Sequence, residues 1–131
     1  MYKKIFITII IAILTSTTTY ADFNLPKAIK AYNHNLDSNI NGVIESSLVF
    51  ITKLRFSYPE ANFKESLEKI DTLLEDENNP TLHYKLFLTK IILSSNTNNL
   101  VLPVMPDQVG PTEFFIRISE MVFRNTEITR I

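Results

Sequence analysis

Hydrophobic residues recur every three or four positions in several stretches of the chain, which is the spacing of amphipathic α-helices. The clearest stripe follows Asn62, and a similar stripe follows Asn24, 38 positions earlier. A repeat at this offset predicts two tandem helical hairpins. The two stripes consist of Leu25, Ile29, Tyr32 and Leu36, and of Phe63, Leu67, Ile70 and Leu74.

Capping residues and breaks in the pattern set the expected bounds of four helices. Asn24 and Asn62 suit helix N-caps, and Glu65 stands where it would complete a capping box with Asn62. Pro80 suits the first turn of the fourth helix. That helix also contains an alternation typical of a strand, but its length and its three helical neighbours favour a helix. The expected helices span 25–37, 43–56, 63–75 and 80–93, in hairpins that cover 24–56 and 62–93.

The chain changes character over residues 94–111, where prolines and asparagines remove any periodicity. A connection of this length is either a mobile segment or an ordered strap over apolar surface, and the apolar run 100–106 favours the strap. Helical spacing returns over 112–124, although a strand also fits there, and 125–131 are expected to be a frayed tail. The expected fold is therefore all-α: two tandem hairpins, a strap and a C-terminal helix, arranged as a repeat or as an irregular small helical bundle.

The first 21 residues have the layout of a signal peptide. Two lysines near the start are followed by the apolar run 5–14 and by a small polar region that ends at Ala21. An apolar run of ten is too short to cross a bilayer, which takes about 20 residues. We therefore expect export with cleavage before Asp22, no stable membrane insertion afterwards, and one helical domain over 22–131.

Cysteine content and net charge limit the cellular compartments and the classes of partner that we expect. The chain has no cysteine, which fits a bacterial periplasm or the outside of the cell better than a small disulfide-stapled secreted domain. Without Lys3 and Lys4, 11 basic residues face 14 acidic residues, a net charge of −3. Nucleic acids and anionic membranes select a concentrated positive surface, so neither is the expected partner.

Residues 24–93 resemble a HEAT-type repeat. In that family an acidic turn is followed by an apolar helix with a basic residue near its start, and here the turn 75–80 precedes a helix with Leu82, Tyr84, Lys85, Leu86 and Leu88. The chain departs from the family pattern in having no arginine at the basic position and Asn39–Gly42 in place of the first acidic turn. The resemblance implies a helical solenoid that presents an exposed face to another protein. Any two capped amphipathic helices of a small bundle would give the same pattern.

Residue types that carry catalysis or bind metals are sparse. His34 and His83 lack a second ligand at the spacing of common zinc sites, and the carboxylates at 75–77 lack the loop of a calcium site. No glycine-rich phosphate loop and no nucleophile motif is present. We therefore expect no cofactor, no bound metal and no enzymatic activity, although an enzyme with a site assembled only by the fold stays an alternative.

The leading hypothesis is an exported protein–protein interaction module. If the two hairpins stack, one line of the second helix lies beside the equivalent line of the fourth helix, which would give a polar-rimmed strip with an apolar centre. A second hypothesis is an apolar-ligand binder, in which the 100–106 strap and the last helix close a pocket. The partner of the module would be a protein. The predicted strip consists of Glu45, Val49 and Thr52 on the second helix and His83, Phe87 and Lys90 on the fourth.

Overall fold

The computed structural model describes residues 23–106 and 108–128, and this part of the chain is helical with no strand. The prediction of an all-α fold is confirmed, including a helix at both places where a strand also fitted. The predicted signal peptide 1–21 lies outside the described residues. The helices are α2 (Leu25–Asn35), α3 (Asn41–Ser57), α4 (Lys64–Asp76), α5 (Pro80–Ser94) and α6 (Pro111–Ile128), with the 3₁₀ turn η1 at Thr97–Asn99.

Asparagine side chains cap the starts of α2 and α5. The Asn24 side chain accepts a hydrogen bond from the backbone of Lys27, and Asn79 accepts from the first turn of α5, where Pro80 occupies the expected position. Asn62 accepts from the backbone of Lys64 but lies one residue before the N-cap, which is Phe63. Local signals thus place helix starts to within one or two residues.

The C-terminal ends of two helices differ from the expected ones by two residues or more. Helix α2 stops at Asn35, because the following amide groups of Leu36, Asp37 and Ser38 all bond to carbonyls three residues back and tighten the chain into a turn. Helix α6 continues to Ile128, so the predicted tail is wrong for residues 125–128. Met121 remains buried in the second half of α6, which ties that half to the core.

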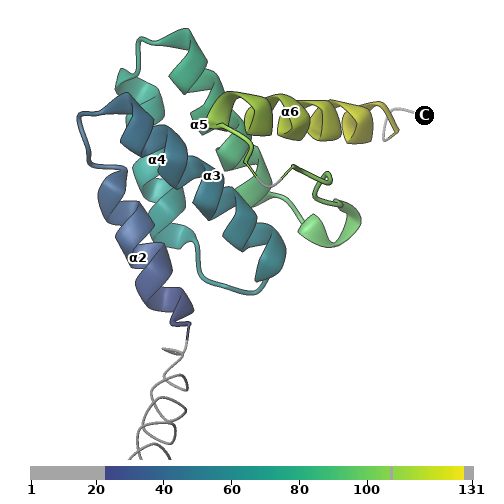
Figure 1. Cartoon of the computed structure of the whole chain (residues 1–131), viewed down its shortest axis with the longest axis horizontal. Coiled ribbons are helices and arrows are strands. Elements are labelled where there is room, and N and C mark those ends of the chain that lie inside the picture. The colour runs from purple at the N-terminus through teal and green to yellow at the C-terminus, as the bar shows by residue number, and fades with distance from the viewer. Residues whose placement is uncertain (1–22, 107, 129–131) are drawn as a thin grey trace, which may run out of the picture.

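The helices pack as two hairpins side by side. Helix α2 packs on α3 and α4 packs on α5, while α3 also lies along α5 and α2 along α4. Helix α6 packs on both α3 and α5, and Figure 1 shows it crossing them and running outward from the bundle. One core is buried between the helices. Its largest fully buried side chains include Leu36, Leu48, Ile51, Ile70, Leu82, Leu86, Leu88, Ile92, Phe114 and Ile118.

The helix starts of the two hairpins are offset by 39 residues, because α2 and α4 begin at 25 and 64 and α3 and α5 at 41 and 80. The expected period was 38, and that value is not confirmed. Residues paired at an offset of 38 are also unequally buried: Leu36 is in the core, whereas Leu74 is half-buried. The hairpins are therefore similar in arrangement without being matched side chain for side chain.

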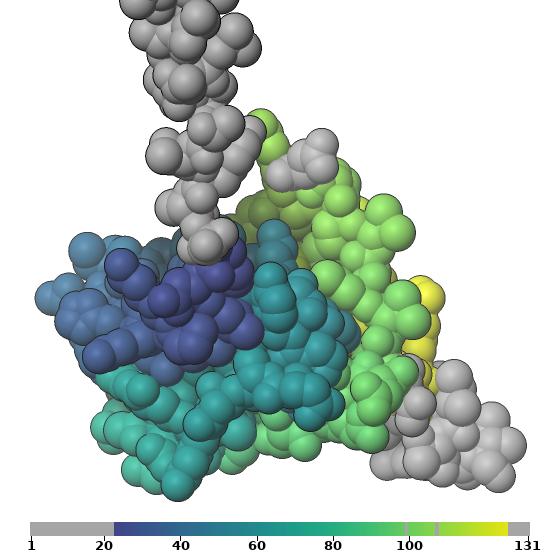
Figure 2. All heavy atoms as spheres, turned by 90° about the horizontal axis from the view of Figure 1, so that it is seen from below, coloured from purple at the N-terminus to yellow at the C-terminus, as the bar shows by residue number. Residues whose placement is uncertain are grey.

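The segment between α5 and α6 lies against the core as a strap. Leu100, Leu102, Met105 and Val109 pack on the core, whereas Val101 and Val104 point to solvent. Arg117 Nη1 donates to the Val104 carbonyl across 3.2 Å and joins the strap to α6. In the space-filling view of Figure 2, the green strap lies on the side of the molecule away from the purple residues of α2.

Candidate functional site

The α3 half of the predicted strip faces inward. Val49 and Thr52 are buried, and Thr52 Oγ1 donates to the Leu48 carbonyl across 2.8 Å and lies 3.5 Å from Thr89 Oγ1 of α5. Glu45 is half-buried and pairs with Lys85 of α5. The line through these α3 residues is therefore part of the contact between α3 and α5, and it is not available to a partner.

The α5 half of the strip lies on the outer side of its helix. His83 is exposed, and the Phe87 side chain is 45% exposed. Lys90 is half-buried and places its Nζ 2.6 Å from the Asp71 carboxylate of α4. Since Val49 and Thr52 are in the core, the six residues do not form one surface, and the predicted strip is wrong as a continuous patch.

The prediction of a continuous strip failed because of the way in which α3 packs against α5. Glu45 contacts Lys85 and Thr52 contacts Thr89, so the two helices run in the same direction with these residues between them. His83 and Phe87 are about 200° around the helix from Lys85, at 100° per residue, and hence on the opposite side. Helical periodicity groups residues onto faces, but it does not say which face meets the neighbouring helix.

A groove between α2 and α4 carries the most polar groups that remain open to a ligand. It contains two adjacent hollows of about 350 and 400 Å³, and Glu65 lines both. In Figure 2 the purple residues of α2 lie against the teal residues that lead into α4. The first hollow is lined by Leu25, Pro26, Ile29, Lys30, Asn33, Ala61, Asn62 and Glu65, and the second by Leu36, Asp37, Ser38, Glu65, Glu68, Lys69, Thr72 and Leu73.

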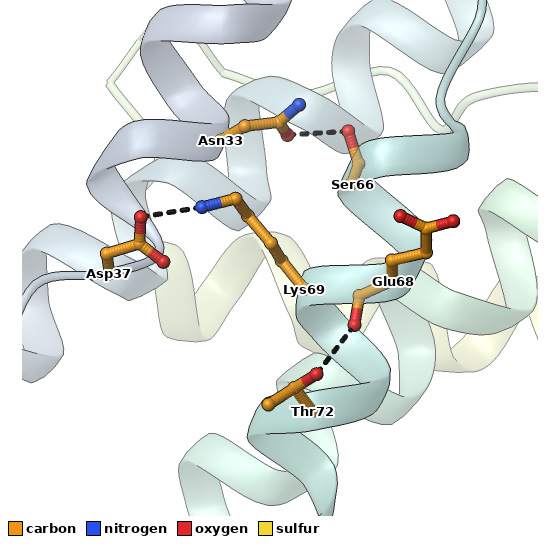
Figure 3. Close-up of polar contacts among 6 residues, drawn as sticks. All are labelled: Asn33, Asp37, Ser66, Glu68, Lys69 and Thr72. Atoms are coloured by element: carbon orange, nitrogen blue, oxygen red, sulfur yellow. Dashed lines mark hydrogen bonds and ion pairs between the residues drawn. The ribbon is translucent and has the colours of Figure 1, made fainter.

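Two polar contacts hold the walls of the groove together, and Figure 3 shows both. Ser66 Oγ of α4 donates to Asn33 Oδ1 of α2 across 2.6 Å, and both side chains are buried. Lys69 Nζ lies 2.6 Å from the Asp37 carboxylate. Because Asn33 pairs with Ser66 and Asp37 with Lys69 in the same order, α2 and α4 are parallel, and their N-terminal ends lie at the first hollow.

Some groups in the groove have no partner in the described part of the chain. Asn33 is only 1% exposed, and its carboxamide nitrogen donates to no described residue, since the dashed line to Ser66 in Figure 3 starts from the oxygen. Lys30 and Glu65 line the first hollow from opposite walls, and neither forms an ion pair within residues 23–106 and 108–128. The first hollow thus offers hydrogen-bond donors on the α2 wall and a carboxylate on the α4 wall.

Helical periodicity alone does not identify these residues, since Asn33 and Lys30 fall on the polar side of their helix. Asn33 lies at the border of the apolar stripe, about 80° from Leu25 at 100° per residue. The border position of Asn33 is the one sequence signal that could have suggested its burial, and it does not identify Ser66 as the partner.

Two further hollows lie around α6. One of about 450 Å³ separates the strap from α6 and is lined by Val101, Pro103, Arg117, Glu120, Met121, Arg124 and Asn125. Another of about 220 Å³ lies between α5 and α6, where Tyr84 Oη and Ser119 Oγ are 2.6 Å apart. The first of these is in the place expected for a ligand pocket closed by the strap.

Neither metal chemistry nor a membrane span is indicated within the described ranges. No group of three or more histidine, aspartate or glutamate side chains there is arranged to hold a metal ion. No helix in those ranges is long and apolar enough to cross a bilayer.

Comparison with known proteins adds no relative to this description. No protein family, curated protein or solved structure matches the chain.

Proposed function

We propose that this chain is a non-enzymatic interaction module that binds an extended segment of a partner protein in the groove between α2 and α4. The observation that carries this proposal is Asn33, a residue only 1% exposed that lines the first hollow and whose carboxamide nitrogen has no acceptor among the described residues. A ligand carbonyl or carboxylate in the hollow can accept from this nitrogen, and such a hydrogen bond contributes about 0.5–1.5 kcal/mol.

The dimensions of the groove suit an extended peptide. Its α2 wall runs from Leu25 to Ser38, which is about 20 Å at 1.5 Å per helical residue. An extended chain advances about 3.3 Å per residue, so about six residues would fill this length. Apolar side chains at the base and charged side chains at the rim have the usual anatomy of a recognition surface. HEAT-like stacking of the two hairpins, which we propose as the origin of the groove, agrees with the contacts between α2 and α4.

Site-specific photocrosslinking tests the proposal. A photoreactive amino acid at Thr72, in the second hollow, should crosslink to a partner in the native cell envelope. The matched control is the same substitution at Lys64, which is exposed on the same helix and lines neither hollow. Crosslinks of equal yield at both positions, or at neither, would contradict binding in the groove.

We also propose that the protein is exported and works in the periplasm or outside the cell. The apolar run and the small residues before Asp22 support this. N-terminal sequencing of the protein from the cell envelope should read from Asp22, and a retained Met1 would contradict cleavage.

A small apolar ligand is the second candidate. The hollow of about 450 Å³ between the strap and α6 favours it, although Arg117 and Arg124 make part of its lining charged. Native mass spectrometry of protein purified from its own host would detect such a ligand as a constant added mass, and an unmodified mass would argue against it.

A further inference from the structure

The two ends of the α2–α4 groove differ in electrostatic character, and this difference gives a bound peptide a direction. The first hollow lies at the N-terminal ends of two parallel helices, where the helix dipoles place partial positive charge. Lys30 adds a full positive charge on the same wall as Asn33. The second hollow has no comparable free cation, because its lysine, Lys69, is paired with Asp37 at 2.6 Å.

We propose that the first hollow binds the free C-terminal carboxylate of the partner segment, an inference that rests on the proposed function. Lys30 and the carboxamide nitrogen of Asn33 would both donate to that carboxylate. Leu25, Ile29 and Ala61 line the same hollow and would contact an apolar final side chain. Charge-assisted hydrogen bonds are stronger than neutral ones, so a terminal carboxylate is preferred over an internal peptide carbonyl.

Glu65 determines which side chains the bound peptide should carry just before its C-terminus. Its carboxylate lies where the two hollows meet, on the α4 wall opposite Lys30 and Asn33. Glu68 lines the second hollow and lies at the limit of an ion pair with Lys64, 4.0 Å away. A peptide with its terminus in the first hollow would pass both carboxylates, so a lysine or arginine one to three residues before its end would pair with Glu65. The partner is thus a peptide with a basic residue, an apolar last residue and a free carboxylate.

Two randomised hexapeptide libraries test this inference directly. They have the same composition, but one ends in a free carboxylate and the other in a carboxamide. Each is incubated with the purified full chain, and retained peptides are quantified by mass spectrometry. We expect retention of the free-acid library to be at least about tenfold higher, the ratio that follows from losing a hydrogen bond to a charged group. Retained sequences should be enriched in an apolar last residue and an upstream lysine or arginine.

Variants of groove residues, each paired with a control outside the groove, show which side chains cause the library preferences. Lys30→Gln should reduce the preference for the free-acid library, whereas Lys27→Gln, on the same helix but outside the hollow, should keep it unchanged. Glu65→Gln should remove the enrichment of basic residues, whereas Glu60→Gln should not. All four positions are exposed, and an unchanged melting temperature would show that the variants are folded.

Several outcomes would overturn the inference. Equal retention of both libraries by the unmodified protein would refute capture of the carboxylate, while sequence enrichment in both would leave peptide binding in the groove intact. A free-acid preference that Lys30→Gln leaves undiminished would place the carboxylate elsewhere. If neither library is retained, the inference fails, and crosslinking at Thr72 then decides the proposed function independently.

Discussion

Lys85 Nζ of α5 lies 3.1 Å from the carboxylate of Glu45 of α3, and the lysine side chain is only 5% exposed. Its ammonium also lies 3.4 Å from Thr112 Oγ1 at the start of α6, so one charge connects three helices. Glu45 is more exposed than Lys85, which makes the two partners unequal: a carboxylate left alone here is reached by water, whereas an ammonium left alone is not.

Glu45→Ala should therefore destabilise the protein more than Lys85→Met. Loss of the carboxylate leaves a buried charge without its counter-ion, at a cost of about 2–3 kcal/mol. Methionine fills most of the lysine volume and leaves Glu45 partly hydrated, at about 1 kcal/mol. Urea denaturation of both variants and of the double variant measures the difference. Equal costs for the two single variants would show that the burial of Lys85 does not control the pair.

Ile70→Ala and Leu67→Ala test how unevenly the α4 stripe is buried. Ile70 is fully buried and Leu67 only half-buried, although the sequence pattern treats them alike. We expect Ile70→Ala to lower the free energy of unfolding by about 2–5 kcal/mol, as other buried aliphatic truncations do, and Leu67→Ala to lower it by about 1–2 kcal/mol. Chemical denaturation gives both values, and a larger cost at Leu67 would contradict the orientation of α4.

Phe87→Ala and Phe114→Ala compare the effect on stability of truncating an exposed and a buried phenylalanine. Phe87 is exposed on the outer side of α5, so its removal should change the stability by less than about 0.5 kcal/mol. Phe114 is buried on the inner side of α6, and its truncation should cost about 3–5 kcal/mol. Differential scanning calorimetry compares them. Because the proposed groove lies between α2 and α4, Phe87→Ala should also leave the crosslink at Thr72 unchanged.

Arg55 joins two connections that are distant in the sequence. Its Nη1 donates to the Pro59 carbonyl before α4, and its Nη2 donates to the Ser95 carbonyl after α5 across 2.9 Å. Lysine cannot make this forked pair of bonds, so Arg55→Lys should cost about 1–3 kcal/mol. Hydrogen exchange should become faster around both connections, and acceleration at only one of them would contradict the bridging role.

The strap can be tested with two neighbouring aliphatic residues. Leu102 packs against the core, whereas Val101 is 83% exposed. Leu102→Ala should therefore cost about 1–2 kcal/mol, and Val101→Ala should stay within about 0.5 kcal/mol. Thermal unfolding of the two variants decides this. Equal melting temperatures would mean that the strap contributes little to the packing.

The sequence by itself determined the class of the fold and the places where helices begin. Asn24, Asn79 and Pro80 act on their own helix ends through short-range hydrogen bonds and a restricted backbone angle, so their effect is readable without the rest of the chain. Stripes of apolar residues likewise show that a helix is amphipathic, because 3.6 residues per turn is a local property. The same local information predicted the connection at 94–111 and a helix after it.

Only the tertiary structure decided which helix faces meet. Thr52 lies on the interface because α3 runs along α5, and Asn33 is buried because Ser66 of α4 lies against it. Both contacts join residues more than 30 positions apart, and they depend on how whole helices are rotated and placed against each other. Several such arrangements satisfy the same stripes, and the packing of all the core side chains together selects one of them. The groove between α2 and α4 results from this packing arrangement, and local sequence patterns therefore do not predict it.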